Sequence, residues 1–327
     1  MEVYVKFLIL SERRQGKRIM KVSWQGVIPA VTTNFNSDYS VDYGFFAAHL
    51  NRMVAAGATG IVPLGSLGEG ATLSFDEKVG LIEAAVKTVG DRVPVIPGIA
   101  SLSTAEAVRL AQAAEASGCS GLMVLPPYVY STDWREMKAH VAAIIEATGL
   151  PTMLYNNPPA YKTDFLAEHI AELAAEYPNL EAVKESSADV RRVASIRAVA
   201  GDRLKILVGV DDAIVEGLMA GANGWIAGLV NAFPVESVEL FNHALAVRDH
   251  NGDRASLEKL YYWFLPLLRM DNGPKFVQLI KLAQETVGNG SARVRAPRLE
   301  LTGDELAEAQ QTLTHALENR PVLAGVK

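Results

Sequence analysis

The chain has 327 residues but a single cysteine, Cys119, so it cannot contain an intrachain disulfide framework. It also lacks any run approaching the ~18 apolar residues that a membrane-spanning helix requires. Basic residues are not in excess, because 31 Lys and Arg against 37 Asp and Glu give a formal net charge of −6. This balance argues against nucleic acid or an anionic membrane as the main partner. We therefore expect a cytoplasmic protein that acts on a small molecule.

Two signatures of bound groups are also missing. No H-x-H pattern follows a predicted strand, so the six histidines give no support for a metal site. The G-x-G-x-x-G fingerprint of dinucleotide-binding folds does not follow the first predicted strand, where residues 26–36 contain no glycine pair. We therefore predict a protein without a metal and without a cofactor.

What the chain does contain is a repeated pattern of glycine and apolar strand. Segments that begin at Gly57, Gly118 and Gly221 share a helix-ending glycine, two further residues, a second glycine and an apolar run. The first glycine suits a left-handed helix end, and the second allows close packing of helix on strand. Five other apolar segments are typical of buried strands: 27–32, 93–97, 152–155, 180–184 and 205–210.

Amphipathic segments separate these eight strands, for example residues 41–56, 76–89, 104–117 and 134–147. Ser74 with Glu77, and Ser103 with Glu106, have the spacing of helix-capping boxes. Alternation of eight strands with helices predicts a (β/α)₈ barrel of the TIM type, an α/β fold. A doubly wound open sheet is the alternative.

We expect three regions along the chain. Residues 1–19 read as a poorly ordered extension, because the apolar stretch precedes its basic cluster, the reverse of a secretory signal. Residues 20–250 should form the barrel, and residues 251–327 should form C-terminal helices packed on it. The predicted helices after the last strand span 237–248, 254–270, 274–286 and 303–317, with a breaker at 272–274.

Lys184 is the most informative residue. It ends the apolar run 180–183 and precedes the polar residues 185–187. Desolvation at such a position lowers the pKa of an amine, and a partly neutral amine attacks carbonyl groups. The alternative is a lysine whose amine reaches solvent at the strand end. Other polar strand ends favour catalysis, because active sites of this fold lie at the carboxyl ends of the strands.

Several of those strand ends carry suitable groups. The glycine-rich loop 65–70 can bind a carboxylate or phosphate through backbone N–H groups, and Ser66 adds a hydroxyl. Tyr155 can move a proton near a Schiff base with Ser66 as its relay, although a packing role would also suit a barrel tyrosine. The candidate substrate-binding residues are Gly65, Ser66, Leu67, Tyr130, Asn156, Asn157, Gly209, Asp211, Asp212 and Ile226.

Three motifs, in this order and spacing, carry a family resemblance: Gly65-Ser66-Leu67-Gly68-Glu69, Tyr155-Asn156-Asn157-Pro158 and Val183-Lys184-Glu185. The chain resembles the dihydrodipicolinate synthase and N-acetylneuraminate lyase family of Schiff-base barrels over about residues 24–317. The resemblance implies a Schiff base between Lys184 and the keto carbon of pyruvate or another 2-oxo acid. It implies that Tyr155 and Ser66 move protons, that backbone N–H groups near Ser66 and Leu67 hold the substrate carboxylate, and that the protein is a homotetramer.

The chain departs from dihydrodipicolinate synthases at three positions. Leu67 stands where the family commonly has a second hydroxyl residue, and Val129 stands where these synthases have a tyrosine. Ala160 takes the place of the arginine that binds the aldehyde's carboxylate. Loss of that bidentate ion pair predicts weak dihydrodipicolinate synthesis.

The segments around Tyr155 and Lys184 most resemble deaminases of 1-pyrroline-4-hydroxy-2-carboxylate, which yield 2-oxoglutarate semialdehyde and ammonia. Other functions stay open: a dihydrodipicolinate synthase, a sugar-acid aldolase or dehydratase, and a catalytically silent regulatory protein that binds a 2-oxo acid. A phosphate-binding barrel that uses residues 224–228 is a further reading, although this loop has no basic residue.

Overall fold

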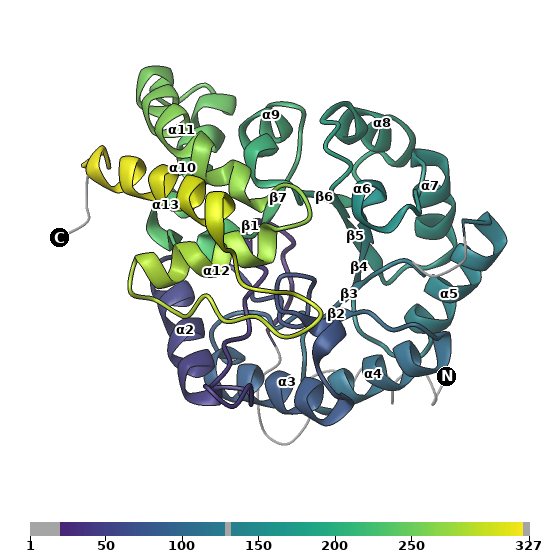
Figure 1. The fold of residues 1–327 in the computed structure, drawn as a ribbon. Coiled ribbons are helices and arrows are strands. Elements are labelled where there is room, and N and C mark those ends of the chain that lie inside the picture. Colours follow the sequence, from purple (N-terminus) through teal and green to yellow (C-terminus); the bar gives the residue numbers. More distant parts are fainter. Residues whose placement is uncertain (1–19, 128–131, 323–327) are drawn as a thin grey trace.

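The computed structural model describes residues 20–127 and 132–322, and the predicted extension 1–19 lies outside them. Seven parallel strands curl into a barrel in the order β1-β7-β6-β5-β4-β3-β2, with helices around the outside (Figure 1). The strands are β1 Gly26–Pro29, β2 Gly98–Ile99, β3 Leu122–Val124, β4 Thr152–Asn156, β5 Leu180–Glu185, β6 Lys205–Val208 and β7 Gly224–Ala227.

The second of the eight predicted strands closes the gap between β1 and β2 as isolated parallel bridges. Val62 pairs with Ala30, and Ile61 pairs with Val95. Pro63 ends this short ladder because proline has no N–H to donate, and Pro94 and Pro97 interrupt the next predicted strand in the same way. The barrel prediction is therefore confirmed, and the open-sheet alternative is wrong.

The helices around the barrel follow the predicted amphipathic segments closely. At the start of α3, the Ser74 side chain accepts from Glu77 N and the Glu77 side chain accepts from Ser74 N, which is the predicted capping box. The longer helices of the described barrel are α2 Tyr43–Ala55, α3 Phe75–Val89, α4 Thr104–Ala116, α5 Trp134–Glu146, α7 Ala167–Glu176, α8 Arg191–Ala200 and α10 Pro234–Arg248. The shorter ones are η1 Gly70–Thr72, α6 Pro158–Tyr161, η2 Asp211–Ala213, α9 Ile214–Met219 and η3 Leu229–Asn231.

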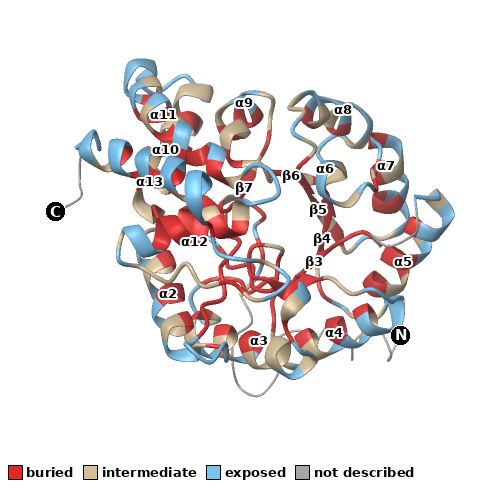
Figure 2. Ribbon diagram, in the orientation of Figure 1, coloured by how far each residue is buried: buried red, intermediate tan, exposed pale blue. Residues whose placement is uncertain are grey.

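The C-terminal helices pack directly on the barrel. They are α11 Arg254–Leu268, η4 Arg269–Asp271, α12 Phe276–Thr286 and α13 Gly303–Glu318. Most of α12 is buried, as Figure 2 shows in red. Among the described residues, no helix is both long and apolar enough to span a membrane.

A buried ion pair holds α12 to the loop after the second strand. Lys281 Nζ lies 2.5 Å from Glu69 Oε1, and neither side chain is exposed. Glu69 also accepts a hydrogen bond of 3.0 Å from Arg295 N. Because a buried charge is stable only when it is paired, these contacts fix the C-terminal segments beside the carboxyl ends of the strands.

Candidate active site

A cavity of about 620 Å³ opens at the carboxyl ends of the strands. Its walls come from the ends of the strands, from α6 and from the segments 271–276 and 298 of the C-terminal region. The predicted site residues that line it are Gly65, Ser66, Leu67, Tyr155, Asn157, Lys184, Gly209 and Ile226. The parallel sheet brings them together because all strands end at the same rim.

Lys184 stands at the centre of this group. It is 6% exposed, and its Nζ lies 4.0 Å from the centroid of the Tyr155 ring. Burial lowers the pKa of Lys184 to about 8, although the charges of Asp271 and Asp211 oppose the shift. With a pKa near 8, about a tenth of the amine is neutral at pH 7. The side chain can therefore act as a nucleophile without a separate base.

Gly209 makes room for the lysine side chain. A Cβ added at Gly209, just beyond β6, would lie 2.8 Å from Lys184 Cγ and would also collide with the Ser186 hydroxyl. Contacts this close do not occur between carbon atoms in well-packed proteins. Glycine at this position therefore permits the path that Lys184 takes into the cavity.

Tyr155 is the neighbour of Lys184 in the sheet, where the two residues are paired across β4 and β5. Asn157 Nδ2 donates to the Tyr155 hydroxyl oxygen at 2.9 Å, while Asn157 Oδ1 accepts from Ala160 N at 3.1 Å. The second bond fixes the orientation of the amide. Burial raises the pKa of Tyr155, so the hydroxyl keeps its proton and is free to donate it.

Ser66 contacts a different tyrosine from the one that we predicted. Its hydroxyl forms a short hydrogen bond with the hydroxyl of Tyr161 on α6. The Tyr161 ring packs edge-on against Tyr155 with centroids 5.8 Å apart. The Tyr161 hydroxyl partly opposes the rise that burial causes in the pKa of Tyr155. The hydroxyls of Ser66, Tyr161 and Tyr155 therefore form one connected series along the cavity wall.

The structure does not bring Asn156, Asp211 or Asp212 to the cavity lining. Asn156 is fully buried and donates to Glu185 Oε2 at 3.1 Å. Asp211 accepts from Trp225 Nε1 at 2.8 Å and from the backbone of Leu229 at 2.6 Å, and so holds the end of β7. Asp212 pairs with Arg269 at 3.6 Å. Polar residues beside a strand end can hold neighbouring residues in place as well as bind substrate, and these three do the former. The predicted contact Tyr130 lies outside the described residues.

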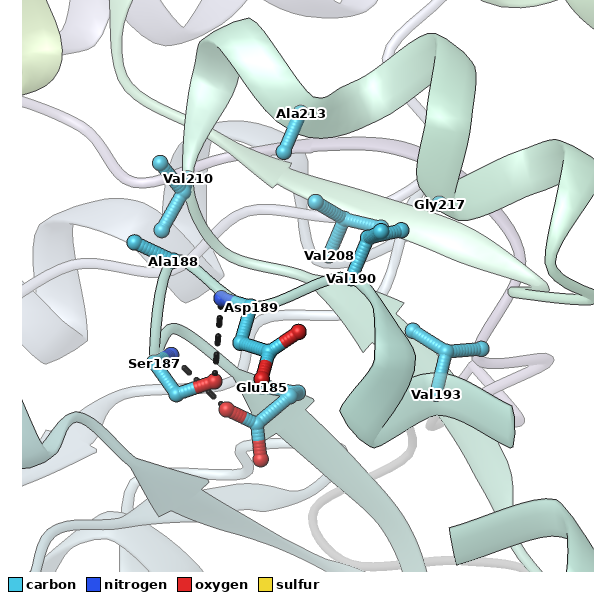
Figure 3. A pocket seen from close by; sticks show the side chains of 10 residues that line it. All are labelled: Glu185, Ser187, Ala188, Asp189, Val190, Val193, Val208, Val210, Ala213 and Gly217. Carbon is cyan, nitrogen blue, oxygen red and sulfur yellow. Dashed lines mark hydrogen bonds between the residues drawn. The ribbon is translucent and has the colours of Figure 1, made fainter. Parts of the chain in front are cut away.

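The turn after Lys184 is held by its own side chains. The Glu185 carboxylate accepts from Ser187 N at 2.7 Å, and the Ser187 hydroxyl accepts from Asp189 N at 3.3 Å (Figure 3). These groups border a second cavity of about 20 Å³, which has room for about one water molecule. The turn leaves the Ser186 hydroxyl on the wall of the main cavity. Among the residues that the structure describes, that hydroxyl has no hydrogen-bond partner in good geometry, although it lies close enough to Tyr155 to lower the pKa of that residue.

Sequence reasoning missed the part of the cavity that the C-terminal region supplies. Asp271 at the end of η4, Arg298, and Phe276 at the start of α12 all line it. Arg298 lies 3.9 Å from Glu69, whose carboxylate is already bound by Lys281. The only signal in the sequence was an acidic residue directly before the 272–274 breaker. Nothing in the local pattern indicates that this turn faces the strand ends.

Possible metal ligands do not gather at this site. No group of three or more His, Cys, Asp or Glu residues within 20–127 and 132–322 lies close enough together to hold a metal ion. The polar side-chain groups at the cavity are instead an amine, hydroxyls, amides, a carboxyl and a guanidinium. This set suits proton transfer and covalent catalysis by the protein's own side chains.

Comparison with known proteins gives a consistent result. The profile of the dihydrodipicolinate synthetase family matches residues 23–316. The 4-hydroxy-tetrahydrodipicolinate synthase of Rhizobium meliloti is 34% identical over 295 residues, which cover 90% of this chain and 98% of that protein. The enzyme of the same name from Macrococcus caseolyticus is 31% identical, over 88% of this chain and 96% of the relative.

Solved structures agree in fold. The dihydrodipicolinate synthase of Aquifex aeolicus superposes with a TM-score of 0.83 and 27% identity, over 90% of this chain and 97% of the other. A prophage protein of the dihydrodipicolinic acid synthase family from E. coli K12 was solved in complex with pyruvate. It superposes with a TM-score of 0.83 and 27% identity, over 90% of this chain and 99% of the other.

Proposed function

Because the chain belongs to the dihydrodipicolinate synthetase family of Schiff-base lyases, we propose that Lys184 forms the Schiff base with a 2-oxo acid or its cyclic imine. The observation that carries this proposal is the buried amine at the end of β5. Its pKa is lowered to about 8, and it lies against Tyr155 in a cavity large enough for a small organic acid.

The proposed chemistry uses the hydroxyl series beside Lys184. The neutral amine adds to C2 of the substrate, and a C2–N bond forms as the C2=O or C2=N double bond opens. Tyr155 donates its proton to the departing oxygen or ring nitrogen, and afterwards takes a proton from C3 to give the enamine. Ser66 and Tyr161 pass the proton onward, while backbone N–H groups at 66–67 hold the carboxylate.

For the substrate, we propose 1-pyrroline-4-hydroxy-2-carboxylate. Opening of its ring by Lys184, loss of the 4-hydroxyl and hydrolysis consume one water overall and give 2-oxoglutarate semialdehyde and ammonia. Ala160 and Leu67 on the cavity wall support this choice, because a hydroxylated cyclic imine needs no second cationic anchor there. The reaction requires only acid–base groups and a nucleophile.

A second candidate is a 4-hydroxy-tetrahydrodipicolinate synthase, the activity that names the curated relatives. One observation favours it. Arg298 lines the cavity, and its guanidinium would bind the carboxylate of an aldehyde in place of the missing arginine. We also propose a homotetramer, which light scattering would detect as four times 35.2 kDa.

The test is borohydride reduction in the presence of pyruvate, followed by intact mass and peptide mapping. We expect one pyruvate-derived adduct per chain, on Lys184, and none in Lys184→Ala. An adduct on another lysine, or none with any 2-oxo acid, would contradict the proposal. Ammonia release from 1-pyrroline-4-hydroxy-2-carboxylate, compared with condensation of pyruvate and aspartate semialdehyde, separates the two substrates.

A further inference from the structure

Asp271 reaches the cavity from outside the barrel strands. It ends η4, and its carboxyl lies against Gly228, directly after β7, where an added Cβ would be 2.7 Å from Asp271 Cγ. Gly228 and Asp271 line the same cavity as Lys184. A side chain at position 228 would push this carboxyl away, so the glycine sets its position.

The order of the strands places Asp271 and Tyr155 on different sides of the lysine. Tyr155 is on β4, next to Lys184 on β5, whereas Asp271 lies beyond the end of β7, two strands further along the sheet. The negative charge of Asp271 nevertheless acts to raise the pKa of Lys184 and the pKa of Tyr155. The three groups therefore line the same cavity from different sides of its rim.

The Asp271 carboxyl has few protein partners. Among the described residues its side chain has no ion pair within 4.0 Å, and the nearby backbone of Asp211 partly stabilises its charged form. The charged groups that face it are Lys184, Asp211 and Asp212. Burial and the charge of Asp211 raise the pKa of Asp271 well above its ordinary value, against the opposing effect of Lys184. Burial therefore favours the protonated form of this carboxyl, which is the form that can donate a proton.

We propose that Asp271 is the acid that protonates the departing 4-hydroxyl of a Schiff-base intermediate on Lys184. This inference rests on the proposed function and adds a catalytic residue to it. Tyr155 first takes a proton from C3 to give the enamine. The enamine electrons then form a C3=C4 double bond while the C4–O bond breaks, and the hydroxyl leaves as water with the proton of Asp271. The Asp271 carboxylate regains a proton from solvent.

Two separate acids suit this reaction because its two proton transfers occur at different atoms. Tyr155 contacts Lys184 and serves the carbons next to the Schiff base. The departing hydroxyl is on C4, two bonds beyond C2, and requires a donor from another direction. Elimination of hydroxide without an acid is slow, and a positioned acid contributes about 10²–10⁴-fold. A simple counter-ion to the lysine would instead act on Schiff-base formation itself.

The test compares the full-length wild type with Asp271→Asn, which keeps the shape of the side chain but cannot act as an acid. We expect ammonia release from 1-pyrroline-4-hydroxy-2-carboxylate to fall by about 10²–10⁴-fold. Borohydride trapping of pyruvate, and exchange of the pyruvate methyl hydrogens with deuterium oxide followed by NMR, should stay within about threefold because neither requires loss of a 4-hydroxyl. Asp249→Asn, an exposed acid after α10, is the matched control and should change nothing.

The outcomes are distinguishable. Equal losses of trapping, exchange and ammonia release would make Asp271 a counter-ion and overturn the proposal, as would an unchanged rate of ammonia release. A wild type that traps pyruvate but releases no ammonia contradicts the deaminase function. The same comparison then uses water release from a 3-deoxy-2-oxo sugar acid, which loses the same hydroxyl. A wild type that eliminates from neither substrate overturns the role of Asp271 as well.

Discussion

At the scale of single residues, the proposed covalent chemistry depends on the amine of Lys184. We expect Lys184→Ala to abolish turnover while the fold is kept, and Lys184→Arg not to restore it, because a guanidinium does not form a Schiff base. Turnover of a 2-oxo acid, with circular dichroism as the control for folding, measures this. Substantial activity in the alanine variant would contradict the mechanism.

The lowered pKa of Lys184 gives a dependence on pH. The neutral amine is the reactive form, so the rate of trappable adduct formation with pyruvate should rise about tenfold per pH unit below 8 and level off above it. An ordinary lysine would level off near pH 10 instead. Borohydride trapping over pH 6–10 distinguishes the two values.

Tyr155→Phe removes one hydroxyl and keeps the ring against which the amine packs. If Tyr155 moves protons, turnover should fall by about 10²–10⁴-fold, while the Schiff base still forms slowly. Tyr161→Phe is the companion variant, because it removes the hydroxyl that contacts Ser66. A turnover rate unchanged in Tyr155→Phe would limit this residue to packing.

At the scale of secondary-structure elements, the Glu69–Lys281 pair joins α12 to the loop that follows the second strand. Lys281→Met should lower the free energy of unfolding by about 3–5 kcal/mol, because it leaves the Glu69 carboxylate buried without its cation. Urea denaturation measures this change. Adding Glu69→Gln should recover part of the loss, and an equal or larger loss in the double variant would show that the pair is not the source.

Regular elements were the part of the fold that sequence patterns predicted well. Apolar runs and capping residues indicated the strands and most helices, because these signals are local. The second strand was harder, since Pro63, Pro94 and Pro97 reduce its ladder to isolated bridges. At the site, Lys184 and Tyr155 were recognisable because strand ends share one rim. Asp271 and Arg298 were not, because their place depends on how α12 packs against distant loops.

At the scale of the whole molecule, we expect the residues that line the cavity together to determine which substrate reacts. With Ala160 on its wall, condensation of pyruvate with aspartate semialdehyde should be much slower than ammonia release from 1-pyrroline-4-hydroxy-2-carboxylate, because a carboxylate there meets no bidentate partner. A coupled assay of both reactions on one preparation measures the ratio. Efficient synthase activity that disappears in Arg298→Ala would show that Arg298 replaces the missing arginine.

The buried contacts of α12 attach the segment 271–298 to the barrel, and this segment can change in sequence separately from the barrel strands. The strand ends carry Lys184 and Tyr155, whereas the segment 271–298 contributes Asp271 and Arg298 to the lining of the same cavity. We expect a graft of that segment from a related barrel, including the residue that pairs with Glu69, to change the substrate preference while Lys184 stays in place. New specificities on this scaffold can therefore arise by changes in one contiguous stretch of the gene, while Lys184 and Tyr155 stay unchanged.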